Sequence, residues 1–243
     1  MATNKAITLH QFPKANEGVS LSPFCIKVES FLILNGLNYQ NEFTPNPSSA
    51  PYKKFPFIED SNGQLVPDSR LILKHLTKSR SLSLDDHLNQ GQLALGHLAV
   101  RSLEEGTYWI LYYNRWQPKA AWSQVKKAAF ADMPALLRSI LPDLIRRDVI
   151  KTHWRQGVSR LSKEQRQSLL QQDLTSLAIT LDQKPFFLGP QVSSFDCSIH
   201  AFLKSMMIKS IEADTSELVL EHSNLADYVE RFDQLLAERQ NDS

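Results

Sequence analysis

The chain has 243 residues, with 27 Lys and Arg against 26 Asp and Glu and a formal net charge of +1. This balance, and the absence of any basic run, argue against a nucleic-acid-binding surface or a polybasic membrane patch. A hydrophobic content of 42% with 22% charged residues is ordinary for a soluble globular protein. The apolar runs are only a few residues long, so we expect no membrane-spanning segment.

The two cysteines, Cys25 and Cys197, lie far apart in the sequence. No Cys/His cluster has the spacing of a zinc site, so we expect neither a metal nor a disulfide framework. Residues 1–5 lead into a strand-like pattern without the apolar core of a signal peptide. The sequence therefore predicts a cytoplasmic protein.

The first third of the chain alternates between strand and helix periods. Ser22 precedes Pro23, a pair typical of a helix N-cap and first helical residue. Gly36 is expected just after the end of the same helix. The predicted elements are a strand at 6–10, a helix at 22–34, a strand at 38–44, a strand within 54–59, a strand at 64–66 and a helix from 68. This order is β-α-β followed by β-β-α.

Residues 79–83 are polar and are interpreted as a linker, and all later segments have helical patterns. The predicted domains are therefore 1–79 and 84–243. The predicted helical features are a capping box at Ser83–Asp86 that opens a helix to about Arg115, a helix at 120–131, a helix from Met133–Pro134 to Gly157, a capping box at 162–165, a turn at 184–190, a capping box at 193–196 and a last helix around 225–235.

Ser22 is the first candidate functional residue. At a helix N-terminus, free backbone N–H groups and the positive end of the helix dipole lie beside the capping hydroxyl. Such a place suits an anion, including a thiolate. The alternative is that Ser22 only caps its helix.

Three motifs in order resemble those of the cytosolic glutathione transferases. They are Ser22-Pro23-Phe24, the stretch Lys54–Glu59 followed by Asp68-Ser69, and the box from Ser193 to Asp196. The first resembles the serine-type members, the plant tau class among them. The resemblance implies an N-terminal thioredoxin-like β-α-β-β-β-α domain followed by an all-helical bundle domain.

Further stretches are similar to one subgroup, that of the failed-axon-connections proteins and the metaxins. These stretches are Ser20–Cys25, Tyr108-Trp109 with Arg115-Trp116, and Lys184–Phe187. The resemblance covers nearly the whole chain.

The reaction implied by the family is attack of the glutathione thiolate on a hydrophobic electrophile, with glutathione as co-substrate. A free thiol has a pKa of about 8.5, and lowering it by two units requires about 2.7 kcal/mol of thiolate stabilisation. A serine O–H donor and a helix dipole together supply about that much. Tyrosine-type members take the donor from the end of the first strand, where this chain has Phe12. Ser22 is therefore the expected catalytic residue, and Ser20 is its alternative.

Cys25 also invites a redox interpretation. Its thiol stands at the fourth position of S-P-F-C, one turn inside the helix, whereas glutaredoxin-like chemistry uses the first position. We therefore interpret Cys25 as a small apolar helix residue.

The resemblance assigns glutathione binding to Phe24, Lys54, Phe55, Pro56, Asp68 and Ser69. A cis Pro56 lets the backbone of Phe55 pair with the cysteinyl unit, while an ordinary trans proline is the alternative. Asp68 receives the γ-glutamyl ammonium and Ser69 the carboxylate, although both residues also suit plain N-capping. Lys54 is either a contact of the glycyl carboxylate or a lone surface lysine.

Aromatic residues gather in one predicted helix, which by family analogy walls the electrophile site. The expected contacts there are Tyr108, Tyr112, Arg115 and Trp116. Core packing alone also explains such a stripe.

Two functions remain open at this point. The first is a glutathione S-transferase of the detoxifying kind, and the alternative is a non-catalytic scaffold or binding module of metaxin type. The subgroup resemblance, the long loop before Ser22 and the bulky Phe55 favour the alternative. The presence together of Ser22, the segment from Lys54 to Pro56 and Asp68-Ser69 favours the enzyme. A homodimer is expected only by analogy with the family.

Overall fold

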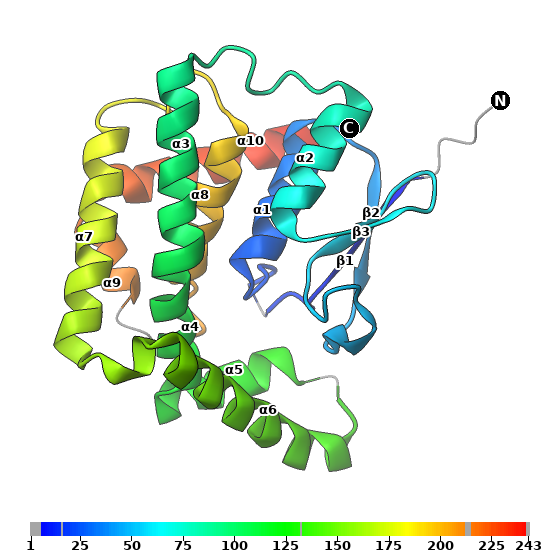
Figure 1. The fold of residues 1–243 in the computed structure, drawn as a ribbon, viewed down its shortest axis with the longest axis vertical. Coiled ribbons are helices and arrows are strands. Elements are labelled where there is room, and N and C mark those ends of the chain that lie inside the picture. Colours follow the sequence, from blue (N-terminus) through cyan, green and yellow to red (C-terminus); the bar gives the residue numbers. More distant parts are fainter. Residues whose placement is uncertain (1–5, 16, 132, 212–214, 242–243) are drawn as a thin grey trace.

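The structure, a computed structural model, describes residues 6–15, 17–131, 133–211 and 215–241 (Figure 1). Its first part contains β1 (Ile7–Gln11), α1 (Pro23–Leu34), β2 (Tyr39–Phe43), β3 (Phe57–Glu59), β4 (Leu65–Pro67) and α2 (Ser69–Arg80). The sheet order is β2-β1-β3-β4, with β1 and β2 parallel and the other pairs antiparallel. The predicted thioredoxin-like β-α-β-β-β-α order is confirmed.

The second part is helical, as predicted. It contains α3 (Gln90–Ser102), one π-helical turn (Leu103–Thr107), α4 (Tyr108–Trp116), α5 (Lys119–Ala129), α6 (Ala135–Gln156), α7 (Lys163–Leu181), α8 (Ser194–Met206), α9 (Thr215–Leu220) and α10 (Ser223–Asn241). Short 3₁₀ turns lie at Pro47–Ser49 and Val158–Arg160. The division into domains at 79–84 stays a prediction; α2 extends through Arg80, and a loop leads from it to α3.

Helix α1 lies between the sheet and the helical part, where it packs on α2, α8 and α10 (Figure 1). Every residue of α1 except Phe24 is buried. A helix that is enclosed on all sides favours apolar residues, and Val28, Phe31 and Leu32 follow this preference at 0–1% exposure. The charged residues that α1 buries, Lys27 and Glu29, form ion pairs. The N-terminus of α1 is therefore held at the junction of both parts of the molecule.

The predicted capping box at Ser83–Asp86 is wrong. The Asp86 N–H donates to the Ser83 carbonyl in an isolated turn, and α3 begins only at Gln90, where Asn89 and Gln92 form the reciprocal box. The loop is used differently, because the Asp85 carboxylate accepts a bond from the Ser194 N–H at 2.7 Å. The loop therefore forms a hydrogen bond with the start of α8 and does not begin a helix at Ser83.

Other predicted helix ends are confirmed. Capping boxes stand at Ser162–Gln165 and Ser193–Asp196, and α6 ends at Gly157, whose φ of 116° favours glycine. The helix predicted to continue to Arg115 is divided by the π-helical turn, and α9 was not predicted.

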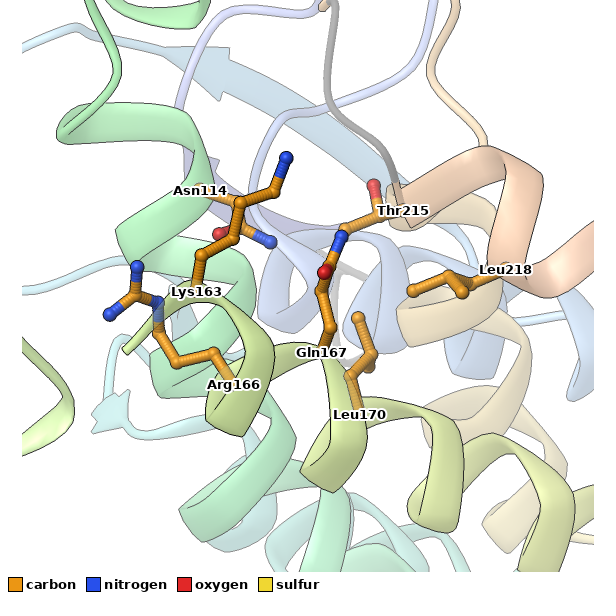
Figure 2. A pocket seen from close by; sticks show the side chains of 7 residues that line it. All are labelled: Asn114, Lys163, Arg166, Gln167, Leu170, Thr215 and Leu218. Carbon is orange, nitrogen blue, oxygen red and sulfur yellow. The ribbon is translucent and has the colours of Figure 1, made fainter. Parts of the chain in front are cut away.

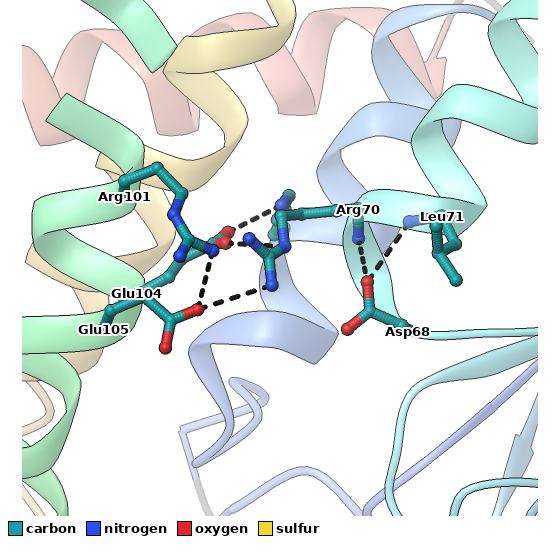
Figure 3. Close-up of polar contacts among 7 residues, drawn as sticks. Asp68, Arg70, Leu71, Arg101, Glu104 and Glu105 are labelled. Carbon is teal, nitrogen blue, oxygen red and sulfur yellow. Dashed lines mark hydrogen bonds and ion pairs between the residues drawn. The ribbon is translucent and has the colours of Figure 1, made fainter. Parts of the chain in front are cut away.

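A buried ion pair joins the two parts of the chain. Lys27 Nζ of α1 lies 2.6 Å from Glu104 Oε1 of the π-helical turn, and both side chains are at most 3% exposed. Arg70 of α2 extends the contact, with its Nε 3.4 Å from Glu104 Oε2 (Figure 3). Glu105 lies between Arg70 and Arg101 on the exposed side. The pair therefore fixes α1 and α2 against the helical part.

Replacing Lys27 with methionine leaves the Glu104 carboxylate buried without its closest cation. We expect Lys27→Met to lower the free energy of unfolding by about 3–5 kcal/mol, measured by urea denaturation. Arg101→Met, which breaks an exposed pair, is the control and is expected to change it by less than about 1 kcal/mol.

The double variant Lys27→Met, Glu104→Met tests the cause, because removing both charges takes away the desolvation cost together with the attraction. We expect it to regain most of the stability lost in Lys27→Met. A Lys27→Met protein as stable as wild type contradicts the assigned role of the pair.

Candidate functional site

Ser22 is the N-cap of α1, and Pro23 occupies the first helical position, as predicted. The Ser22 backbone is extended, with φ −92° and ψ 116°, and its hydroxyl oxygen accepts a hydrogen bond from the Cys25 N–H at 3.4 Å. The side chain is partly exposed, so a ligand can reach it. The hydroxyl and the positive end of α1 thus face the same place.

Ser20, the alternative donor, occupies a different position. It is 1% exposed, and its hydroxyl oxygen accepts a bond from the Ser22 N–H at 3.2 Å. The two serines are therefore arranged one behind the other, with Ser22 closer to solvent. This arrangement supports Ser22 as the residue that meets a ligand.

Cys25 is fully buried, and burial raises the pKa of its thiol to about 11. Hydrogen bonding from Ser22 lowers that pKa only in part. Cys25 packs with Ala50, Phe55 and Phe57. A thiol in this environment stays protonated at neutral pH, which supports its interpretation as a small apolar residue.

The Phe55–Pro56 peptide bond is cis, as predicted from the motif. It immediately precedes β3. Phe55 is 6% exposed and meets the ring of Phe12 edge to face, with the ring centroids 5.0 Å apart. Lys54, in contrast, is exposed. The loop that carries the cis bond therefore packs through Phe55 against the end of β1.

Asp68 and Ser69 begin α2. The Asp68 carboxylate accepts bonds from the backbone N–H groups of Arg70 at 3.0 Å and Leu71 at 3.2 Å (Figure 3). Asp68 has a φ of 68°, an uncommon conformation for a residue other than glycine. Ser69 is 4% exposed. N-capping is thus present at this end, and Glu104 and Arg70 lie close to it.

The sequence did not predict that Arg70 and Glu104 lie close to the candidate site. Only the Arg101–Glu105 pair has a local signal, because its members stand four positions apart on one helical face. The partners of Glu104 come from α1 and α2, far away in the sequence.

The predicted aromatic patch forms a ladder along α4. Phe24 meets Tyr108 at 5.0 Å between ring centroids, Tyr108 meets Tyr112 at 5.4 Å, and Tyr112 meets Trp116 at 5.5 Å. Residues four apart share one helical face, which explains the alignment. Phe24 is the second residue of α1, so the ladder begins in the helical turn that Ser22 caps.

Arg115 does not extend this ladder. Its guanidinium donates to the carbonyls of Leu21 and Ser205, and to the Ser205 hydroxyl at 3.0 Å. The side chain is 6% exposed, and burial lowers the pKa of the guanidinium to about 10. Its predicted contact with the electrophile stays a prediction, while its observed contacts are with protein groups.

His153 of α6 packs against the same ladder. Its ring meets Tyr112 edge to face at 4.8 Å, and burial lowers its pKa to about 4. The imidazole is therefore neutral at physiological pH. The neutral imidazole thus packs against the aromatic rings without adding a charge to the ladder.

The hollows in the described part of the chain include the following two. One, of about 270 Å³, lies between the loop after β1 and the end of α5; its lining residues are Pro13, Lys14, Phe43, Pro45, Ala129 and Met133. The other, of about 30 Å³, lies between α4, α7 and α9 (Figure 2). Its size is that of about one water molecule.

Among the described residues, no group of three or more His, Cys, Asp or Glu side chains is placed to hold a metal ion. Across the same residues, none of the helices has the length and apolar character needed to cross a membrane.

Family profiles match most of the chain. The glutathione S-transferase N-terminal domain matches residues 23–121, and the glutathione S-transferase C-terminal domain matches residues 170–232. The isoprene-epoxide–glutathione S-transferase of Rhodococcus sp. (strain AD45) is 30% identical over 93% of this chain and 97% of its own.

The chain belongs to the glutathione S-transferase family.

Within this family, two further relatives confirm the predicted subgroup. Failed axon connections of Drosophila melanogaster is 31% identical over 82% of this chain, and the match spans 50% of that protein. Metaxin-1 of Mus musculus is 25% identical over 68% of this chain and 54% of its own.

Solved glutathione transferases share the fold. The crystal structure of GSTFuA3 from Phanerochaete chrysosporium matches with a TM-score of 0.67 at 16% identity, over 95% of this chain and 97% of that one.

The burial of Cys25 leads to a direct prediction. A rise of the thiol pKa from 9.0 to about 11 lowers the thiolate fraction at pH 8 about hundredfold. We expect iodoacetamide to alkylate Cys25 at least about a hundredfold more slowly in the folded protein than in urea. Mass spectrometry of the Cys25 peptide measures both rates, and the buried Cys197 is the internal comparison. Alkylation of native Cys25 at the unfolded rate would restore the redox interpretation.

Proposed function

We propose that this protein is a glutathione S-transferase in which the Ser22 hydroxyl stabilises the glutathione thiolate. The observation that carries the proposal is the placement of Ser22, partly exposed, at the N-terminus of α1. The helix dipole and one hydroxyl donor together match the roughly 2.7 kcal/mol that a two-unit lowering of a thiol pKa requires.

The remaining family residues are arranged in agreement with this role. The cis peptide bond at Phe55–Pro56 precedes β3, and the N-termini of α1 and α2, with their free backbone N–H groups, lie in the same first part of the chain. We assign the cysteinyl backbone to Phe55, the γ-glutamyl ammonium to Asp68 and its carboxylate to Ser69. Lys54 is exposed, which suits a contact with the glycyl carboxylate.

The aromatic ladder from Phe24 to Trp116 suits an apolar electrophile. In the reaction, the sulfur lone pair forms a carbon–sulfur bond while the bond to the leaving oxygen or halide breaks with its electron pair. The relative from Rhodococcus is by name an isoprene-epoxide–glutathione S-transferase, which supports an electrophile of modest size. Detoxification, a cytoplasmic location and a homodimer remain part of this proposal.

A second candidate function is a non-catalytic scaffold or binding module of metaxin type. It is favoured by the matches to Failed axon connections and Metaxin-1, and by the tight packing of Phe55 in the loop where the peptide would pair. Calorimetry with glutathione distinguishes the two functions. Absence of binding at millimolar glutathione supports the scaffold and excludes the transferase.

Removing the Ser22 hydroxyl tests its catalytic role. We expect Ser22→Ala to lower kcat/KM with an aryl halide about 10- to 100-fold, because one hydrogen bond to a charged group is lost. Ser20→Ala is the comparison and is expected to give a smaller loss, because the buried Ser20 hydroxyl accepts from the Ser22 N–H and acts on the thiolate only through Ser22. A loss confined to Ser20→Ala would transfer the role to Ser20.

The two roles of Asp68 are separable, because asparagine caps a helix about as well as aspartate but has no charge. We expect Asp68→Asn to weaken glutathione binding about 5- to 10-fold by calorimetry, with a stability change below about 1 kcal/mol. Asp86→Asn, an exposed acid in the loop before α3, is the control. Unchanged affinity in Asp68→Asn would reduce Asp68 to a helix cap.

A further inference from the structure

Arg115 links two segments that are far apart in the sequence. It stands in the last turn of α4, and its guanidinium donates both to the Leu21 carbonyl and to the end of α8, at the Ser205 carbonyl and hydroxyl. The side chain is 6% exposed. Within the described part of the chain, no carboxylate forms an ion pair with it. Its charge is met by backbone and hydroxyl dipoles instead.

Burying a cation without a paired anion lowers the stability of the folded protein. Transfer of a charge out of water is unfavourable, and apolar side chains of similar volume often stabilise a protein as well or better. Burial lowers the pKa of Arg115 to about 10, so the guanidinium still carries its charge at neutral pH. The feature therefore points to a role beyond packing.

The peptide that Arg115 contacts is the one that leads into Ser22. Its carbonyl, that of Leu21, accepts from Arg115, and its N–H, that of Ser22, donates to the Ser20 hydroxyl at 3.2 Å. Both polar groups of this peptide are thus held. The Leu21 side chain packs in a cluster with Trp122 and Ile208. With the peptide plane fixed, the direction of the Ser22 side chain is restricted as well.

We propose that Arg115 is a positioning residue, which fixes the Leu21–Ser22 peptide so that the Ser22 hydroxyl meets the glutathione sulfur. This inference rests on the proposed function. The charge of Arg115 also adds to the positive end of α1, one peptide away from Ser22. Its field also acts on Tyr108, at the start of the same helix, where it opposes the rise in pKa that burial causes.

The test compares two arginines that make similar contacts. Arg115→Lys keeps the charge but loses the planar fork that bridges two segments. Arg146→Lys is the matched control, because Arg146 also donates to two backbone carbonyls, those of Trp116 and Gln117. Among the described residues, its hydrogen bonds do not include the peptide before Ser22. Each variant is titrated with glutathione alone, and thiolate absorbance against pH gives the pKa of the bound thiol.

We expect Arg115→Lys to raise the pKa of the bound thiol by about one unit, which means about tenfold less thiolate at neutral pH. Glutathione affinity by calorimetry is expected to stay within about threefold, because the γ-glutamyl and glycyl contacts are untouched. Arg146→Lys is expected to leave the pKa unchanged. A loss of thermal stability in Arg115→Lys with an unchanged thiol pKa would mark Arg115 as merely structural and overturn the proposal.

The wild-type titration separates this inference from the proposed function. A wild type that binds no glutathione, or binds it with an unshifted thiol pKa, overturns both. A lowered pKa in wild type that persists in Arg115→Lys overturns only the role of Arg115.

Should Arg115→Lys fail to fold, Ser205→Ala decides instead. It removes one partner of the guanidinium, while Ser198→Ala removes another buried α8 hydroxyl as a control. We expect a smaller rise in thiol pKa, of the same sign, in Ser205→Ala alone. Equal pKa values in the two variants overturn the proposal.

Discussion

The enclosure of α1 is the constraint on which the rest of the structure depends. This helix is buried along its whole length except at Phe24, between the sheet on one side and α2, α8 and α10 on the others. A helix held in this way cannot shift without disturbing both parts of the molecule. Its N-terminus is therefore a fixed point, and Ser22 stands on it.

Two buried cations connect this fixed point to the helical part. Lys27 meets Glu104 in the π-helical turn, and Arg115 meets the carbonyl of Leu21. Both contacts carry an energetic penalty, because both charges lose their hydration on burial. What they provide is a defined orientation of the two parts around the start of α1. We infer that the geometry at Ser22 depends on residues outside the thioredoxin-like domain.

The features that follow from local rules could be predicted from the sequence. The strand and helix order, the boxes at Ser162 and Ser193, and the cap at Ser22 all depend on residues a few positions apart. The box at Ser83 was wrong because Asp85 bonds to Ser194, 109 positions away. No pattern among neighbouring residues predicts a hydrogen bond between residues so far apart in the sequence.

The same reasoning explains what was missed in the candidate site. Lys27 and Glu104 are 77 positions apart, so their pairing leaves no periodic signal. The part of the aromatic ladder in α4 was predictable, because its members recur every four residues, whereas the contact of Phe24 with Tyr108 was not. Arg115 stands in the same helix, but its partners are backbone carbonyls. Every residue has a carbonyl, so the sequence does not indicate which of them bind Arg115.

The central claim is that glutathione binds with its sulfur at the Ser22 hydroxyl. A crystal structure of the protein with glutathione tests this most directly. The account predicts the sulfur within hydrogen-bonding distance of Ser22 Oγ, with the cysteinyl backbone paired to Phe55 across the cis bond. A sulfur bonded to Ser20 instead, or a site that stays without glutathione at millimolar concentration, would contradict it.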